Sequence, residues 1–512
     1  MNIVIVGGGT AGWLTALIIS ARHPNHNVTV IESSKLGVIG VGESTTGRFT
    51  DILTNHKFNY GCNLTDFIIE TGATLKYAIH HKGWTNDIDR GYLGPIDGSY
   101  SCDNVPDFLL SWGQQNLTPT DFVKISEFGH RIANNKSNFN KFNKKFIDNS
   151  HAMHIDAHLA GQYFKKVTLK KDNAAYIDSI VKTVNLNSKN GFIKSVLLED
   201  GRSIEGDFFI DCSGFNKILM NAVAPNKWIS YQNNLPLNTG LPFLLRYKEN
   251  EIPEPYTTAW AQKNGWMWQI PLLDRKGCGY VFCDAFTTAD KAQEEIETIL
   301  GQPIDPIRTI KFDSGRQESA WVKNCLTIGL SSAFLEPLEA TSIHSSVVQA
   351  HNFAVEYLKD TVDNTITEGS QKIYNQRTRI MYDDIKDFIV MHYMGGRTDS
   401  DFWKMINTGI TRTEFVSTLL SMSKGRLPST NDFSNYPGGA GWSLYSFVMT
   451  GLNLIGKNTS AKELKTISDH GTLQHVAAEI YYNMQDVWDQ NLKDCYSYDE
   501  FIKYFRNIRG VK

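Results

Sequence analysis

The sequence predicts an α/β fold: a Rossmann-like nucleotide-binding module of the flavin monooxygenase type, an interwoven substrate region and a helical C-terminal part. Three observations predict it. A strand, a glycine turn, a helix and a second strand follow one another within about 30 residues of the N-terminus. Strand-like segments suited to the same sheet recur much later in the chain. After Glu339 the apolar pattern becomes helical.

The N-terminal unit begins with "IVIV" at 3–6, whose continuous β-branched run is typical of a strand buried on both faces. The glycine turn at 7–12 follows, then the helical pattern "WLTALIISAR". A second strand is predicted over 27–33, "NVTVIES". This order is that of a dinucleotide-binding βαβ unit.

The glycine turn has the spacing GxGxxG, with Gly7, Gly9 and Gly12 at the three glycine positions. The first permits a tight turn, the second lets the backbone approach a pyrophosphate, and the third lets the helix pack on the strand. Glu32 lies 20 residues after Gly12, where an acid can accept hydrogen bonds from ribose hydroxyls. The alternative is a glycine turn that only packs a bare βα unit. We predict dinucleotide binding, with Thr10 and Ala11 also at the phosphates.

Only one such fingerprint is present, at the extreme N-terminus, and later segments return to the sheet. Both features favour FAD held by a large discontinuous module over a nicotinamide site. Further candidate cofactor contacts are Gly42, Ile180, Gly329 and Ile343.

Later in the chain, segments predicted to add strands to the sheet of this module alternate with other segments. The strand-adding segments are called returns. The predicted returns are 174–186, 191–214 and 325–332; mixed segments fill about 50–150 and 215–312. We therefore predict an FAD-binding module with interwoven substrate-side segments over 1–350. Residues 351–512 are predicted to form a mainly helical substrate-side region.

Composition excludes several classes of protein. The net charge is −3 with no long run of one sign, which does not favour nucleic acid or an anionic membrane. No apolar run approaches the roughly 18 residues of a membrane span. The seven cysteines are scattered without a CxxC pair, which argues against a disulfide framework and a cysteine zinc site. A strand at 3–6 leaves no room for a preceding signal peptide, so we expect a cytoplasmic protein.

Three histidines in "HAMHIDAHLAGQYF", His151, His154 and His158, would share one helical face if the whole segment were helical. No carboxylate or cysteine cluster accompanies them, so we predict no metal site there. A helix that starts beside Asp156 explains the segment better than a metal site does.

The stretch "GWMWQIP" at 265–271 predicts a strand with both indoles, Trp266 and Trp268, on one face and Pro271 at its end. Such a pair forms either part of the core or a wall between a cofactor ring and a substrate.

This stretch fits the GWxWxIP signature of the flavin-dependent halogenases, and further segments of the chain resemble that family in order. The family resembled includes the tryptophan halogenases, and the likeness is good over about 1–350 and looser beyond. The segments are "IVIVGGGTAGW", "VTVIES", "IGVGEST", "HIDAHL", "FIDCSGF", "GYVF" and "AWVKNCLTIGLSSAFLEPLE". In the family, the tryptophan motif keeps the substrate away from the flavin, which implies that role for Trp266 and Trp268.

The resemblance implies two catalytic residues. The family's lysine falls in "TLKYAIHHKGW" at Lys76, with Lys82 as the nearby rival. An ammonium there can hydrogen-bond or capture hypohalous acid and hold the halogen over an aryl carbon. The apolar surroundings of Lys76 should lower its pKa. The family's glutamate falls at Glu339, which can orient the halogenating species and accept the ring proton, whereas Glu336 is expected to be structural.

The resemblance also places the halide at the residues after Glu339. Tryptophan halogenases have Ser-Thr-Gly there, whereas this chain has Ala340-Thr341-Ser342, so Thr341 and Ser342 become the candidate halide-binding residues. The His and Phe that sandwich tryptophan in the family have no clear counterparts around "GYLGPIDGSYSCDNVP". The segment "GGAGWSLYSFVMTGLNLIG" also departs from the family register.

The resemblance implies a two-component FAD halogenase that halogenates an electron-rich indole- or phenol-type substrate with chloride, bromide or iodide. Reduced FAD is expected from a separate flavin reductase, and the oligomeric state stays open. Two alternatives remain: an FAD-dependent aromatic hydroxylase, and a flavin-binding protein without redox chemistry. Neither needs Lys76, Glu339 and GWxWxIP together.

Overall fold

The structure is a computed structural model of the whole chain. It describes residues 1–37, 40, 42–54, 60–96, 107–359, 361–362, 365–409, 412–433, 439–467 and 472–511. Two segments that the sequence singled out lie partly outside these residues: positions 39 and 41 of "IGVGEST", and residues 97–106 of the segment compared with the tryptophan sandwich.

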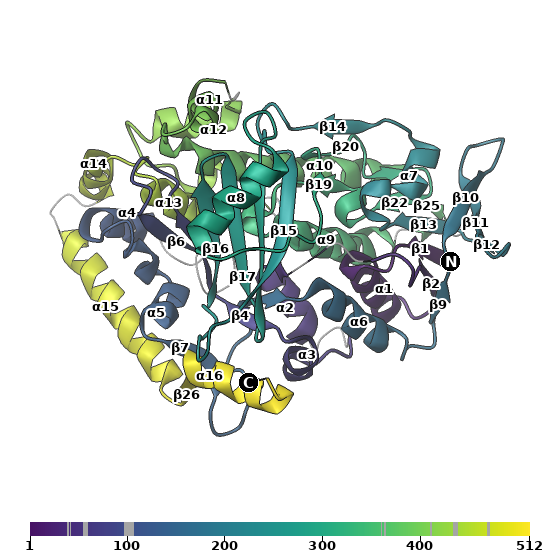
Figure 1. Cartoon of the computed structure of the whole chain (residues 1–512), viewed down its shortest axis with the longest axis horizontal. Helices are drawn as coiled ribbons and strands as arrows, with labels where there is room; N and C mark the ends of the chain where they lie inside the picture. The colour runs from purple at the N-terminus through teal and green to yellow at the C-terminus, as the bar shows by residue number, and fades with distance from the viewer. Residues whose placement is uncertain are drawn as a thin grey trace.

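A six-stranded sheet forms the predicted nucleotide-binding module, at the N-terminal end of the molecule (Figure 1). Its five strands from β22 to β9 run parallel, and β21 adds an antiparallel edge. Helix α1 (Thr10–Arg22) packs against α6 (Ala157–Thr168) and α9 (Thr341–Asn352). The strand order is β21 (Trp321–Val322), β22 (Cys325–Thr327), β13 (Phe208–Asp211), β1 (Asn2–Val6), β2 (Asn27–Glu32) and β9 (Ala174–Asp178).

The predicted first strand is confirmed, because the side chains of β1 from Ile3 to Val6 are buried as a doubly covered strand requires. The predicted returns are only partly right. β9, β13 and β22 do join this sheet, but the hairpins between them form a sheet of their own: β10 (Val181–Leu186), β11 (Ile193–Leu198) and β12 (Ser203–Glu205). No residue of β10 is fully buried, and only Val181 and Val184 are partly covered, as in a strand at the surface.

A seven-stranded sheet makes up the interwoven region, with α8 (Ala289–Leu300) lying across it in Figure 1. It is antiparallel except where β16 and β5 run parallel. The order is β19 (Ile310–Lys311), β15 (Thr239–Arg246), β18 (Arg275–Phe282), β17 (Gly265–Pro271), β16 (Tyr256–Gln262), β5 (Ala78–Lys82) and β6 (Gly91–Pro95).

A small separate sheet carries Lys76. Its strands are β3 (Glu43–Ser44), β8 (Ala152–Ile155) and β4 (Thr74–Lys76), with β8 in the centre. The histidine-rich segment is therefore not one helix. His154 lies in β8, whereas α6 begins at Ala157 with the Asp156 side chain accepting a hydrogen bond from the Leu159 amide, as expected for a cap.

The remaining elements are mostly helices. Minor sheets are β14 (Trp228–Ser230) with β20 (Gly315–Gln317) and β23 (Ala333–Phe334), β24 (Thr361–Val362) with β25 (Thr365–Ile366), and β7 (Lys136–Asn140) with β26 (Cys495–Ser497). Besides α1, α6 and α8, the helices described before Glu339 are α2 (Gly47–Thr54), α3 (Leu64–Thr71), α4 (Asp107–Asn116), α5 (Glu127–Ala133) and α7 (Ile218–Val223). Those after α9 are α10 (Glu368–His392), α11 (Asp401–Gly409), α12 (Glu414–Met422), α13 (Trp442–Gly451), α14 (Lys457–Ile467), α15 (Thr472–Leu492) and α16 (Tyr498–Arg509).

The C-terminal helices are not a separate appendage. Helix α10 packs against α13, and α16 returns to pack on α3 and β7 near the start of the fold. Of the helices that the structure describes, none combines the length and the apolar character needed to cross a membrane. The six cysteines within the described ranges are all free thiols, as their scattered spacing predicts.

Candidate active site

The glycine turn between β1 and α1 has the geometry of a phosphate-binding loop. Gly7 has φ +115°, and a Cβ there would lie 2.1 Å from the Cys212 carbonyl oxygen. A Cβ on Gly12 would lie 1.9 Å from the Gly7 carbonyl oxygen. Gly9, by contrast, faces open space with no atom within 4 Å of a Cβ. The first and third glycines are thus needed for the fold, and the second leaves room for a ligand.

The N-terminus of α1 opens onto that space. Gly9 is the N-cap residue and supplies no side-chain hydrogen bond, so the amides of the first turn face outward at Thr10 and Ala11. A helix N-terminus with such amides favours a phosphate. Thr10 donates its hydroxyl to the Ala157 carbonyl, which fixes the turn against α6.

Glu32 ends β2 beside this loop. Its Oε2 accepts hydrogen bonds from Trp13 Nε1 at 3.2 Å and Lys165 Nζ at 3.1 Å, and the side chain is 23% exposed. The carboxylate is therefore oriented but still reachable, as the predicted ribose contact requires.

The other candidate cofactor contacts lie on different elements around the same module. Gly329 has φ +74°, and a Cβ there would lie 2.8 Å from the Ala11 side chain, so it packs directly against the start of α1. Ile343 is in α9, Ile180 joins β9 to β10, and Gly42 lies against Gly277 of β18. Together with the open space at Gly9, this arrangement fits an FAD.

Lys76 is fully buried at the end of β4, so it is not a solvated surface residue. Its Nζ donates a hydrogen bond to the Thr45 carbonyl at 3.0 Å. Burial lowers the pKa of Lys76 to about 7, with the Glu339 carboxylate acting in the opposite direction. The direction of this shift is the one predicted from the sequence.

Glu339 ends the short 3₁₀ turn Pro337–Glu339, directly before α9, and its side chain is 15% exposed. Its Oε1 lies 2.7 Å from His392 Nε2 and 3.2 Å from His81 Nε2. Burial alone would raise the pKa of Glu339, but the two imidazoles more than offset it and hold that pKa well below its usual range. Glu339 is therefore a carboxylate.

Lys76 and Glu339 line one pocket, which contains about 480 Å³ of space, part of it open to solvent. Thr341 lines it as well, so three residues predicted for the reaction meet there. The wall is otherwise mainly apolar. Its other lining residues are Thr46, Ile79, Pro95, Ile96, His344, Ile385, Phe388, Gly439, Ala440 and Leu444.

The N-terminus of α9 is the candidate halide site. Ala340 precedes it in a left-handed conformation, φ 58°, and provides no side-chain cap. The amides of Thr341 and Ser342 thus begin a helix whose dipole favours an anion. Thr341, two residues after Glu339, lines the pocket, whereas Ser342 is not among the described residues that line it.

The tryptophan motif forms β17 as predicted, and Pro271 is its last residue. Trp266 and Trp268 lie on one face with ring centroids 6.3 Å apart. Trp266 is buried, and its Nε1 donates a hydrogen bond of 2.8 Å to Glu336. Tyr393 donates a second bond, of 2.5 Å, to the same oxygen. Glu336 thus holds Trp266 in place, while Glu339 faces the pocket.

The rival lysine, Lys82, faces away from the pocket. Side chains alternate along β5, so Ile79 and His81 face the pocket side while His80 and Lys82 face the other. Lys82 Nζ lies 4.0 Å from the centre of the Trp260 ring.

Sequence reasoning missed two site residues, His81 and His392. Both are buried, and no motif marks either one. If "YAIHHKGW" is a strand, its alternation predicts that His81 lies on the face opposite His80. His392 carries no comparable signal, because it lies at the end of a long helix far along the chain.

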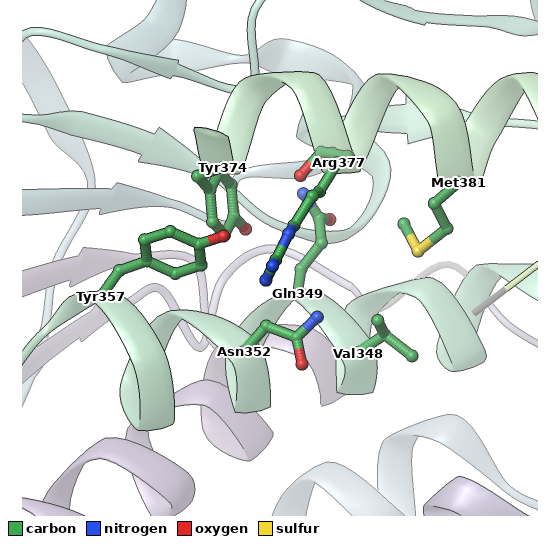
Figure 2. Close-up of a pocket in the computed structure, with 8 residues that line it drawn as sticks. Val348, Gln349, Asn352, Tyr357, Tyr374, Arg377 and Met381 are labelled. Carbon is green, nitrogen blue, oxygen red and sulfur yellow. The ribbon is translucent and has the colours of Figure 1, made fainter. Parts of the chain in front are cut away.

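A second pocket lies between α9, the turn that follows it, and α10 (Figure 2). Tyr357 and Tyr374 meet edge to face there, with ring centroids 5.2 Å apart. None of the predicted site residues lines this pocket of about 340 Å³. The chemistry is therefore assigned to the pocket of Lys76.

The architecture is that of the flavin-dependent halogenases. Tar14, the tryptophan C-6 flavin-dependent halogenase from taromycin biosynthesis, matches with a TM-score of 0.86 and 27% identity over 99% of both chains. BrvH, a flavin-dependent halogenase from Brevundimonas sp. BAL3, matches with a TM-score of 0.80 and 27% identity over 98% of this chain and 99% of its own. The predicted fold class is confirmed.

The chain belongs to the tryptophan halogenase family. The family model described as "Tryptophan halogenase" matches residues 2–459, which include the stretch of good likeness and part of the looser region beyond it. Tryptophan 7-halogenase KtzQ of Kutzneria sp. (strain 744) is 30% identical over 431 residues, 79% of this chain and 78% of the relative. Tryptophan 6-halogenase SttH of Streptomyces toxytricini is 30% identical over 491 residues, 90% of each.

Proposed function

We propose that the enzyme is a two-component FAD-dependent halogenase that replaces a ring hydrogen of an electron-rich aromatic substrate with halogen. The observation that carries the proposal is the pocket in which Lys76 and Glu339 meet, although they come from distant parts of the chain. An aromatic hydroxylase needs neither residue.

The cofactor site comprises the glycine turn, the start of α1 and Glu32. The open space at Gly9 admits a pyrophosphate, and Glu32 accepts the ribose hydroxyls. Reduced FAD, supplied by a separate flavin reductase, provides with oxygen the oxidising power that turns halide into hypohalous acid. The amides of Thr341 and Ser342 hold the halide.

Lys76 holds the halogen over the reacting carbon. Its buried amine titrates near neutral pH, so it can act either as an ammonium that hydrogen-bonds hypohalous acid or as an amine that captures the halogen. Glu339 accepts the proton that the ring carbon loses. Trp266 and Trp268 keep the aromatic substrate away from the flavin, and the Glu336 bond fixes Trp266 in that position.

The experiment that tests this function is a mass-spectrometric screen of aromatic compounds with flavin reductase, NADH, oxygen and each halide in turn. A halogen-for-hydrogen exchange supports the proposal. An added oxygen identifies a hydroxylase, and flavin binding without any product identifies a protein without this redox chemistry; either result contradicts the proposal.

We further propose a broad substrate range. The described lining is mainly apolar, with Ile96, Ile385, Phe388 and Leu444, so discrimination rests on shape. A methylene-sized difference in shape between two substrates changes their relative transition-state free energy by about 1 to 3 kcal/mol. Several phenols, indoles and anilines should react, and Ala340-Thr341-Ser342 should admit bromide or iodide. Turnover of free tryptophan alone, at one carbon and with chloride preferred, would contradict this.

A further inference from the structure

His154, from the histidine-rich segment, lies at the centre of the small sheet that carries Lys76. It is in the central strand β8, opposite Ser44 of β3 and opposite Thr74 of β4. Residues paired across strands project from the same face of a sheet, so the three polar side chains form one row. All three are buried, His154 and Thr74 completely. Buried polar groups need hydrogen-bond partners, and this row has them.

Hydrogen bonds join the row into a chain that crosses to the seven-stranded sheet. His154 Nε2 lies 3.0 Å from Thr257 Oγ1 in β16, and that oxygen is 2.8 Å from Ser44 Oγ. At the other ring nitrogen, His154 Nδ1 is 3.0 Å from Thr74 Oγ1. The Thr74 hydroxyl donates at 2.6 Å to the carbonyl of Pro271, the last residue of the tryptophan strand β17. One imidazole thus ties β3 and β4 to two strands of the other sheet.

The direction of every bond in the chain follows from its last acceptor. The Pro271 carbonyl can only accept, so it takes the single hydroxyl hydrogen of Thr74. His154 Nδ1 must then donate to Thr74 Oγ1. Burial holds the pKa of His154 well below its ordinary value, so the ring is neutral and Nε2 accepts from the Thr257 hydroxyl. The oxygen of Thr257 is left to accept from the Ser44 hydroxyl.

Lys76 lies on the same face of the small sheet as this row. It is two residues after Thr74 in β4, and side chains two residues apart share a face of a strand. The amine of Lys76 donates to the carbonyl of Thr45, the residue that follows β3. The amide and hydroxyl of Thr45 both donate to the carbonyl of Met153, the neighbour of His154 in β8, and the Met153 amide donates back to the hydroxyl. The strand that carries the amine and the acceptor of the amine are therefore both held at β8.

We propose that His154 is a positioning residue for Lys76: its hydrogen-bond chain fixes the strand that carries the amine relative to Thr45 and to the end of the tryptophan strand. The inference rests on the proposed function, in which Lys76 must hold the halogen over one ring carbon. A neutral imidazole suits this role because one nitrogen donates while the other accepts, so a single ring joins two hydroxyls. His154 is not among the described residues that line the pocket, so it acts through Lys76.

The first test removes one hydroxyl. Thr257→Val keeps the branched shape of the side chain but breaks both bonds at Thr257 Oγ1. It should reduce the halogenated product formed per flavin oxidised roughly 10-fold, because a small displacement of a reacting group is costly in rate. FAD affinity and flavin reoxidation should stay unchanged, and the unused hypohalous acid should appear in a 1,3-diketone trap. Thr257→Ser, which keeps the hydroxyl, should restore most of the product.

Thr258→Val is the matched control. Thr258 follows Thr257 in β16 and is half-buried on the opposite face of that strand, so its replacement should leave the product yield unchanged. His154→Leu, which removes both ring nitrogens, should lose at least as much product as Thr257→Val. If His154→Leu does not fold, Thr257→Val and Thr257→Ser decide. A normal yield in Thr257→Val, or an equal loss in Thr258→Val, would overturn the proposal.

Two measurements separate this inference from the proposed function, because neither needs halogenation. ¹⁵N-histidine NMR should show His154 as the neutral Nδ1–H tautomer, and Thr74→Val, which removes the acceptor of that hydrogen, should shift the ring toward the Nε2–H tautomer. ¹³C-lysine NMR should follow Lys76, whose pKa of about 7 should fall in Thr257→Val as the ammonium loses its fixed acceptor. Glu339, the other charged group that acts on Lys76, is unaltered in these variants.

The outcomes are distinguishable. If both NMR signals behave as expected but no aromatic compound is halogenated, the proposed function fails and the role of His154 stands. If the parent halogenates while Thr257→Val changes neither the yield nor the titration of Lys76, only the role of His154 is overturned. An Nε2–H tautomer of His154 in the parent would overturn it as well.

Discussion

The glycine turn and the pocket of Lys76 and Glu339 are built in opposite ways. The turn is local: Gly7, Gly9 and Gly12 lie in one loop, and Glu32 ends the next strand. The pocket is assembled from β4, β5, the turn before α9 and the end of α10, segments that are distant in sequence. A local site is specified by spacing, whereas an assembled site is specified by the whole fold. Substitutions in the pocket should therefore leave FAD binding intact, and substitutions in the glycine turn should leave the structure of the pocket intact.

The largest expected effect is that of Lys76→Ala, which should abolish halogenated product. Flavin reoxidation should continue, because the lysine acts after hypohalous acid has formed. Product is measured by mass spectrometry and reoxidation by flavin absorbance. Normal halogenation by this variant would remove Lys76 from the mechanism.

Glu339→Gln should slow product formation by a factor on the order of 10² to 10⁴, the usual contribution of a positioned proton acceptor. The amide keeps the size of the side chain but cannot take the ring proton. FAD affinity, measured by fluorescence quenching, should be unchanged, since Glu339 belongs to the pocket. A parent-like rate would mean that another group accepts the proton.

The contrast between the two regions also explains what the sequence could predict. The βαβ unit, the strand of GWMWQIP and the helical C-terminal part follow from periodicity and turn residues. The resemblance indicated Lys76 and Glu339 as well. It could not indicate His392, because nothing in "DFIVMHYM" marks a helix end that reaches Glu339. Likewise, Glu336 and Glu339 are three residues apart, and only the fold shows that one binds Trp266 and the other faces the pocket.

The pH profile of halogenation should distinguish the two roles open to Lys76. Its pKa of about 7 means that the ammonium predominates below neutral pH and the amine above it. If the ammonium is required, activity is full at low pH and falls by about tenfold per pH unit above 7; if the amine is required, it rises toward high pH instead. The profile of kcat at saturating substrate measures this. A flat profile from about pH 6 to 8 would contradict a titrating Lys76.

Gly9→Val should weaken FAD binding roughly tenfold or more, equivalent to about 1.4 kcal/mol, because the new side chain occupies the space reserved for the pyrophosphate. The fold should tolerate it, since no atom lies within 4 Å of a Cβ at Gly9. Gly425→Val is the control and should bind FAD normally. A Cβ at Gly425 would lie 3.9 Å from the nearest atom, the Met422 carbonyl oxygen. Equal affinities for both variants would show that the cofactor does not approach Gly9.

The smallest expected effect is that of Lys82→Ala, which should change halogenation less than about twofold, within the range of an ordinary surface substitution. Lys82 is only six residues from Lys76, but Lys76 ends β4 and Lys82 ends β5, which belong to different sheets. Alternation within β5 places Lys82 on the face opposite Ile79 and His81, over Trp260. Removing it loses a cation–π contact worth about 0.5 to 1 kcal/mol at a partly exposed site, so a slightly lower melting temperature is expected with an unchanged rate. The comparison with Lys76→Ala is direct, because both variants remove one lysine side chain from the same short segment. If Lys82→Ala loses its product while Lys76→Ala keeps it, the pocket bounded by Lys76 and Glu339 is not where the halogen is transferred.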